Sequence, residues 1–249
     1  MMLTKTLQFD EDVLTVIRAM DWRDDGKLGV LTGGQLERQL YVRVSTALEA
    51  MGGKWNRKQG GHVFVLDPRP RVEGLVESGM LTVERDGFFE TPLAVVQRML
   101  ELVTPHGNML EPEAGLGAIA NHLPRENLLC IEKNEQRAEA LRQKGYLVFC
   151  CDFLDYCTQE HGMFNTIYMN PPFEEGQDIL HVCHAYECLA EGGAIVAIMS
   201  EGSFFRQDDR AADFRTWLYH VNGISEKLSP DAFKESGTGV HARLVVIRK

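Results

Sequence analysis

The fold of this chain is decided by one stretch of sequence, NMLEPEAGLGAIANHLPRENLLCIEKN, residues 108–134. A short apolar run, Asn108–Leu110, leads into a glycine-rich turn, and a second apolar run, Leu128–Ile131, ends at Glu132. We predict a strand for each run and a helix over about Ala118–Leu123 between them. A strand, a glycine turn and a helix before the next strand are typical of a parallel α/β sheet.

The alternation of strands and helices continues on both sides of this stretch. One apolar run, Ala194–Met199, has no polar residue at alternate positions, which is typical of a strand buried on both faces. We therefore predict an α/β fold with a doubly wound, mostly parallel sheet, which binds ligands at the carboxyl ends of its strands. The other predicted elements are helices over Pro92–Val103, Asn134–Gln143, Gly176–Leu189 (ended by Gly192-Gly193) and Gln207–Val221, and strands over Tyr146–Cys150, Thr166–Met169 and Arg243–Arg248.

Residues 1–85 have a different pattern and predict a small accessory module ahead of the main domain, residues 86–249. Helix-like stretches cover Asp10–Met20 and Gly34–Met51, and the sequence shows no internal repeat. Residues 52–71, GGKWNRKQGGHVFVLDPRPR, then predict a hairpin or strand with a basic tip, because their glycines are followed by an apolar run.

Positive charge is concentrated in this module. Leu36–Arg71 carries seven Lys and Arg against three acids, so its net charge is +4 and the total of −10 leaves −14 for the rest. A basic segment is expected where a polyanion docks, and Lys54, Arg57 and Lys58 are the candidate contacts. A solvated turn that merely carries basic residues is the alternative. Trp55 either stacks on a base or packs under the hairpin.

Length and composition exclude several classes of protein. A chain of 249 residues with 44% hydrophobic and 25% charged residues is neither collagen-like, coiled-coil nor disordered. No run of about 18 apolar residues predicts a membrane span, and the N-terminus lacks the apolar core of a secretory signal. Six cysteines without a CxxC pair predict reduced thiols in a cytoplasmic enzyme. The net charge of −10 argues mildly against a protein that coats nucleic acid through bulk charge.

Three short motifs follow predicted strands. In Glu111–Gly117 (EPEAGLG), the glycines let the backbone pass close to a ligand, although a plain tight turn is the alternative; neither a dinucleotide fingerprint nor a P-loop matches. Glu132, 17 residues after Gly115, is placed to accept hydrogen bonds from ribose hydroxyls. Asp152 would accept from an adenine amino group and Phe153 would stack on the ring, while a loop cap is the simpler role for Asp152.

A fourth motif, Asn170-Pro171-Pro172-Phe173, follows the predicted strand Thr166–Met169. Its two prolines fix φ and remove two backbone donors, which leaves carbonyls free to accept hydrogen bonds next to an amide oxygen and an aromatic face. This assembly suits a planar group that bears an NH2. The side-chain oxygen of Asn170 and the carbonyl of Pro171 would accept the amino hydrogens, and Phe173 would stack on the ring.

Together these motifs resemble the class I S-adenosylmethionine-dependent amino-methyltransferases, especially the N6-adenine DNA methyltransferases with the gamma-type motif order. Phe89-Glu90-Thr91-Pro92 resembles their FxTP motif, and the segment from Phe233 to Thr238 resembles one whose aromatic residue helps to hold a flipped base. The resemblance covers about Phe88–Lys249 and implies a seven-stranded Rossmann-like methyltransferase sheet. It also implies S-adenosylmethionine as the cofactor and DNA as the partner.

The resemblance assigns expected roles to individual residues. Thr91 and the Glu111–Gly117 turn would hold the methionine part of the cofactor, Glu132 its ribose, and Asp152 and Phe153 its adenine. The implied cofactor-binding residues are Phe89, Thr91, Pro92, Glu111, Pro112, Gly115, Gly117, Glu132, Asp152, Phe153 and Asn170. The implied catalytic residues are Asn170, Pro171, Pro172 and Phe173, and the target base would meet Phe173 and Phe233, with Lys54, Arg57 and Lys58 as further substrate contacts.

Other functions compete with DNA adenine methylation. Protein-glutamine N5 methylation and RNA amino-methylation suit the same fold, and a non-catalytic binding protein is a third possibility. Only 76 residues follow Phe173, too few for a large target-recognition domain, so a partner subunit or the N-terminal module would have to supply sequence specificity. His181, Cys183, His184 and Cys188 are possible metal ligands on one predicted helix. We expect no metal site, because no second cluster of ligands elsewhere in the sequence completes the coordination.

Overall fold

The computed structural model describes residues 3–85, 89–156, 162–233 and 241–249. The chain divides into two compact units, Met1–Asp86 (unit 1) and Gly87–Lys249 (unit 2). Within the described ranges, no helix has the length and apolar character needed to cross a membrane.

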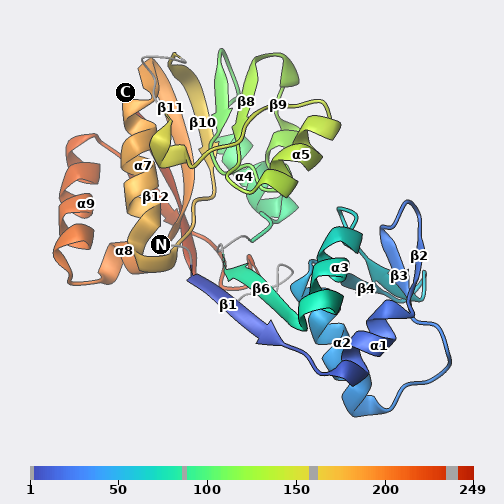
Figure 1. Cartoon of the computed structure of the whole chain (residues 1–249). Helices are drawn as coiled ribbons and strands as arrows, with labels where there is room; N and C mark the ends of the chain where they lie inside the picture. The colour runs from blue at the N-terminus through green and yellow to red at the C-terminus, as the bar shows by residue number, and fades with distance from the viewer. Residues whose placement is uncertain (1–2, 86–88, 157–161, 234–240) are drawn as a thin grey trace. The chain divides into compact units, whose positions relative to one another are not determined.

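Unit 2 is built on a seven-stranded sheet with the order β12-β13-β11-β10-β7-β8-β9 (Figure 1). Only β13 runs antiparallel to its neighbours, so the predicted mostly parallel, doubly wound sheet is confirmed. The strands are β7 (Met109–Glu111), β8 (Leu128–Ile131), β9 (Leu147–Phe149), β10 (Phe164–Met169), β11 (Leu189–Ser200), β12 (Ile224–Lys227) and β13 (Ala242–Arg248).

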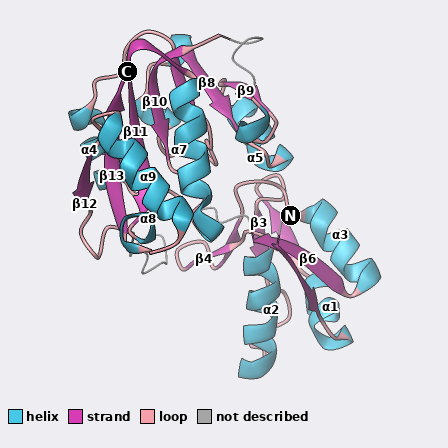
Figure 2. Ribbon diagram, turned by 90° about the vertical axis from the view of Figure 1, so that its left-hand side faces the viewer, coloured by secondary structure: helices cyan, strands magenta, loops and turns pink. Residues whose placement is uncertain are grey.

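Helices cover both faces of this sheet. One face packs on α4 (Leu93–Leu102) and α5 (Glu135–Gln143), and the other packs on α7 (Gln177–Glu187) and α9 (Asp209–His220), which lie side by side in Figure 2. The central strands are buried on both faces, as continuous apolar runs predict. The short elements are α8 (Gly202–Phe205) and the 3-10 turns η1 (Ala120–His122), η2 (Arg125–Asn127), η3 (Phe153–Asp155) and η4 (Glu174–Gly176).

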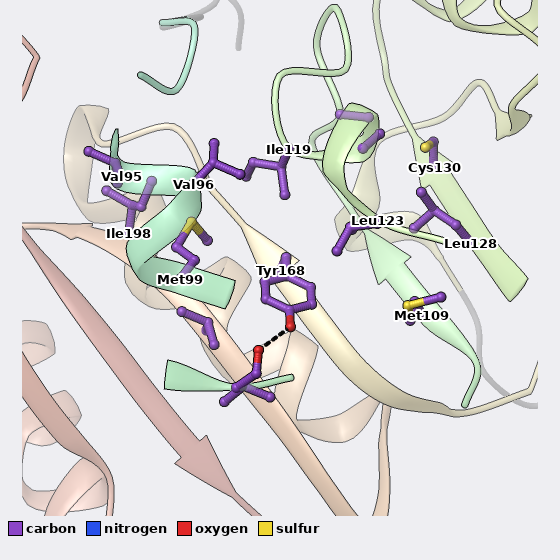
Figure 3. Packing of buried hydrophobic residues seen from close by; sticks show 14 of the residues in the cluster. Val95, Val96, Met99, Met109, Ile119, Leu123, Leu128, Cys130, Tyr168 and Ile198 are labelled. Atoms are coloured by element: carbon purple, nitrogen blue, oxygen red, sulfur yellow. Dashed lines mark hydrogen bonds between the residues drawn. The ribbon is translucent and has the colours of Figure 1, made fainter. Parts of the chain in front are cut away.

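Tyr168 of β10 lies at the centre of the first core (Figure 3). Its ring is fully buried among the side chains of α4 and the neighbouring strands, and its hydroxyl donates a hydrogen bond to the carbonyl of Val103. The bond satisfies a polar group that burial would otherwise make costly. It joins the end of α4 to the strand that leads into Asn170.

Two elements of unit 2 differ from the sequence predictions. The helix expected over Ala118–Leu123 is wrong, because only the 3-10 turn Ala120–His122 forms there. Pro124 explains the difference, since a residue before proline is driven out of the helical region and Leu123 is extended (φ −105°, ψ 149°). The helix predicted over Gly176–Leu189 does end before Gly192-Gly193, at Glu187, but the strand predicted to begin at Ala194 begins at Leu189 and runs through both glycines.

Unit 1 contains a four-stranded antiparallel sheet and a separate two-stranded one. The larger sheet has the order β2-β3-β5-β4, and three helices bury their apolar faces in one cluster beside it. The elements are β1 (Leu3–Gln8), α1 (Glu11–Arg18), β2 (Asp21–Arg23), β3 (Leu28–Val30), α2 (Arg38–Ala50), β4 (Lys54–Asn56), β5 (Gly61–Val63), α3 (Arg69–Ser78) and β6 (Met80–Arg85). The predicted hairpin with a basic tip is confirmed as β4–β5.

Candidate active site

The four motifs meet because their strands are adjacent and parallel. Strands β9, β8, β7 and β10 are neighbours in the sheet, and their carboxyl ends lead to Asp152, Glu132, Glu111 and Asn170 respectively. Parallel strands present their carboxyl ends at one edge, which is where such sheets bind ligands. The site residues of unit 2 therefore gather at one edge of the sheet.

The glycine turn after β7 is shaped by left-handed backbone conformations. Gly115 has φ +55° and Gly117 has φ +86°, values that a side chain disfavours. At Gly117, an added Cβ would also lie 3.0 Å from Cδ2 of Leu141 in α5. The backbone N–H of Gly115 donates a 2.8 Å hydrogen bond to Oε2 of Glu132, so the turn is fastened to the end of the neighbouring strand.

Glu132 is buried, and its carboxylate accepts three hydrogen bonds from the described residues. Besides the Gly115 N–H on Oε2, its Oε1 accepts from the backbone N–H of Asn134 and from the guanidinium of Arg137, each at 2.8 Å. A carboxylate has about four acceptor positions, so the described residues leave one of them open. The sequence analysis missed Arg137; its position in the first turn of α5, five residues after Glu132, was the available signal.

Two more carboxylates lie at the turn. Glu111 is only 2% exposed, and burial raises the pKa of its carboxyl well above the ordinary value, helped by the nearby Glu113 and Glu132. Oε1 of Glu113 lies 2.6 Å from Nδ1 of His181 in α7. Burial also raises the pKa of Glu113, although His181 opposes the shift. Among the described residues, Oε2 of Glu111 and Oε2 of Glu113 have no hydrogen-bond partner.

Asp152 and Phe153 begin the 3-10 turn after β9. Oδ1 of Asp152 accepts a 3.0 Å hydrogen bond from the N–H of Leu154, which is the loop cap that the sequence also suggested. The ring of Phe153 is buried and meets the ring of His184 edge-on at 4.7 Å between centroids. His181 and His184, weighed above as metal ligands, thus have contacts with Glu113 and Phe153, and the described residues hold no metal-ligating cluster.

The amide of Asn170 is oriented by the FxTP segment. Its Nδ2 donates to the carbonyl of Phe89 at 3.3 Å and to the hydroxyl of Thr91 at 3.1 Å. A backbone carbonyl can only accept, so the NH2 group must face Phe89 and the orientation of the amide is fixed. The amide oxygen, Oδ1, accepts no hydrogen bond from the described residues and remains available to an external donor.

The remaining predicted residues of unit 2 surround this loop. Pro171 is buried, Pro172 and Phe173 are half-buried, and Phe173 packs against the first core. Pro92 begins α4 and Pro112 is buried in the glycine turn. Phe233 is only 2% exposed and belongs to the same core cluster as Phe173; the rest of its motif, Lys234 to Thr238, lies outside the described residues.

Lys54, Arg57 and Lys58 belong to unit 1 and are exposed on the β4–β5 hairpin. Trp55 lies between them and is 47% exposed, with edge-on contacts to Tyr41 and His62. The hairpin therefore carries the basic tip on a surface of unit 1.

Comparison with known proteins supports the fold of unit 2. No protein-family model matches the sequence, and no curated protein matches it either. A solved structure described as the modification subunit of a type I restriction enzyme from Vibrio vulnificus YJ016 is similar, with a TM-score of 0.54, 16% identity, and coverage of 86% of this chain and 50% of that chain. A chain from a structural study of complex assembly in a type I R-M system has a TM-score of 0.51, 18% identity, and coverage of 64% and 42%.

This likeness shows a Rossmann-like methyltransferase fold, as the motifs imply. The chain spans half the length of the first structure and less than half of the second.

Proposed function

We propose that this protein is an S-adenosylmethionine-dependent methyltransferase that acts on the exocyclic N6 amino group of adenine in DNA. The observation that carries the proposal is the orientation of Asn170. Phe89 and Thr91 hold its NH2 group, so its oxygen is left to accept a hydrogen from a substrate amino group. The pairing of FxTP with Asn-Pro-Pro-Phe is the combination that favours the DNA enzymes.

The residues at the sheet edge suit the proposed cofactor. S-adenosylmethionine carries a sulfonium and an α-ammonium group, and Glu111 and Glu113 each hold a buried carboxylate oxygen without a partner among the described residues. A nearby cation would favour their charged forms and offset the cost of burial. The left-handed glycines keep side chains away from the turn, and Glu132 has one acceptor position left for a ribose hydroxyl.

The cofactor, when bound, would supply an electrophilic methyl group. Asn170 Oδ1 and the carbonyl of Pro171 would accept the two amino hydrogens of the base, which favours a tetrahedral nitrogen and stabilises the positive charge that develops on it. Phe173 would stack on the ring, offsetting part of the few kcal/mol needed to take a base out of a duplex. Orientation alone can lower a barrier by about 7–11 kcal/mol, so no strong base is required.

The fold likeness to type I systems supports a further part of the proposal. The chain spans half the length of the modification subunit that it resembles. We propose that a partner subunit, or unit 1, supplies sequence specificity.

Methyl-labelled S-adenosylmethionine, incubated with the protein and with DNA, RNA or a protein lysate, tests the reaction. Digestion of the labelled polymer should yield N6-methyladenine from DNA. Label found only in glutamine side chains or only in RNA would assign one of the competing functions instead.

A further inference from the structure

Unit 1 contains the same helix and hairpin twice, although the sequence shows no repeat. Two residues separate α1 from its hairpin and three separate α2 from its hairpin. The first strand of each hairpin has a tryptophan at its centre, and each hairpin has a four-residue loop. Gly29 of one copy pairs across the sheet with His62 of the other, and these are equivalent positions. An approximate two-fold axis therefore passes between β3 and β5. The matched positions are Val13 and Val44, Ile17 and Leu48, Met20 and Met51, Trp22 and Trp55, and Val30 and Val63.

The loop of the first hairpin, Asp24–Lys27, is acidic and lies against its own unit. An added Cβ at Gly26 would come within 2.5 Å of Oδ1 of Asp67, and the carbonyl of Lys27 accepts a 2.8 Å hydrogen bond from the N–H of Phe64. The guanidinium of Arg23, just before the loop, is paired with Asp21 at 2.7 Å. The first loop thus lies against its own unit at Gly26 and at the carbonyl of Lys27, while the side chains of Asp24 and Asp25 are exposed.

The loop of the second hairpin, residues 57–60, is basic and open. Arg57 and Lys58 are exposed, and neither side chain has an ion-pair partner among the described residues. An added Cβ at Gly60 would meet nothing within 4 Å. Oδ1 of Asn56 accepts the N–H groups of Lys58 and Gln59, which fixes the loop conformation without using either cation.

The two tryptophans also differ, and the residue opposite each explains why. Trp22 faces Gly29, and an added Cβ there would lie 2.8 Å from the indole ring, so the ring lies directly over the strand. Trp55 faces His62, whose ring is 1% exposed and fills the corresponding space. Trp55 is therefore displaced outward, and an aromatic surface lies beside Lys54 on the same hairpin.

We infer that the β4–β5 hairpin is a finger that docks along the major groove of B-form DNA, with Arg57 and Lys58 neutralising phosphates on the rim of the groove and Trp55 lying against the sugars. This rests on the proposed function, whose substrate it identifies as a duplex. Charge complementarity selects a polyanion. The major groove of B-DNA is about 12 Å wide and admits a two-stranded ribbon, whereas the deep, narrow major groove of A-form RNA does not.

The test measures how the affinity of the full chain for a 20-base-pair DNA duplex depends on salt, without cofactor, by fluorescence polarisation. Each phosphate contact contributes about −0.9 to the slope of log K against log salt. The double variant Arg57→Ala/Lys58→Ala should therefore flatten the slope by about 1.8 and weaken binding at 0.1 M salt by roughly 10- to 60-fold. An unchanged slope would overturn the inference.

The first hairpin provides the matched control. Asp24→Asn/Asp25→Asn changes the charge of the equivalent loop with residues that tolerate its left-handed conformation, and it should leave the slope unchanged. A flattened slope in this control would mean that the change in slope does not report phosphate contacts at the loop of the second hairpin, and it would overturn the inference. Equal melting temperatures of all variants exclude loss of folding as the cause.

A second arm replaces the DNA with an RNA duplex of the same length. Equally tight binding with the same loss of slope in the variant would overturn the assignment to B-form DNA. The two proposals can also fail separately. Methylation of DNA by the protein, with an unchanged salt slope in Arg57→Ala/Lys58→Ala, would contradict the docking of the hairpin alone. A flattened slope in that variant, without methyl transfer to DNA by the wild type, would contradict the proposed function alone.

Discussion

Unit 2 and unit 1 use their charged groups in opposite ways. At the sheet edge of unit 2, Glu111 and Glu132 are buried and Glu113 is mostly buried. Glu113 contacts His181, and Glu132 is paired with Arg137. In unit 1, Arg57 and Lys58 of the β4–β5 loop are exposed and have no ion-pair partner among the described residues. Buried charges are costly and persist where they hold something specific, whereas exposed charges act through attraction that salt screens. The contrast supports the two proposals, which place the chemistry in unit 2 and docking in unit 1.

The largest effect is expected at the centre of the chemistry. Asn170→Ala removes the oxygen that we propose accepts the substrate hydrogen, and loss of one such oriented group costs about 10²- to 10³-fold in kcat. Single-turnover kinetics with labelled cofactor measures the loss, and calorimetry should find cofactor affinity within a few-fold of the wild type.

Glu174→Ala, an exposed change in the same loop, is the control and should retain normal turnover. If Asn170→Ala also weakened DNA binding as much as the hairpin variant does, the division between the two units would break down.

A second prediction concerns the stability of unit 1 at low pH. His62 is buried, and burial lowers its pKa although Glu49 opposes the shift. The unfolded chain therefore binds a proton near pH 6.5 that the folded chain binds only at lower pH, and stability falls as pH decreases below about 6.5. Neither ring nitrogen has a partner among the described residues, so His62→Phe should stabilise unit 1 by about 1–3 kcal/mol and remove this part of the pH dependence.

Urea unfolding followed by tryptophan fluorescence at pH 7.5 and pH 5.5 measures both effects. His220→Phe replaces an exposed histidine of unit 2 and should leave the pH dependence unchanged. If the wild type and His62→Phe lost equal stability between the two pH values, the account of His62 would be wrong. Turnover equal to that of the wild type in His62→Phe would show that this change in the stability of unit 1 leaves the reaction rate unaffected.

Much of unit 2 could be predicted because each strand carries its own signal. A strand buried on both faces is a continuous apolar run, as in Ala194–Met199, and needs no knowledge of its neighbours. Unit 1 has no such signal. Its repeat is hidden because the two copies share only a few identical residues, among them one tryptophan and one methionine each, while their loops carry opposite charge, DDGK in Asp24–Lys27 and RKQG in residues 57–60.

The site could be predicted only in part for a related reason. Asn170 and Glu132 directly follow strands, so the topology of a parallel sheet places them at one edge. His181 and Arg137 lie on helices, and their contacts with Glu113 and Glu132 depend on how each helix packs against that edge. Spacing along the sequence does not encode that packing.

The smallest effect concerns the group that orients Asn170. Thr91→Val keeps the shape of the side chain but removes the hydroxyl that accepts from Nδ2, leaving the carbonyl of Phe89 as the partner. One hydrogen bond contributes about 1 kcal/mol, so turnover should fall about fivefold. Thr91→Ser retains the hydroxyl and should recover most of the rate in the same single-turnover assay. DNA affinity should be normal in both variants because unit 1 is unchanged. If Thr91→Ser were as slow as Thr91→Val, then packing around residue 91, and not the hydrogen bond, would be what orients Asn170.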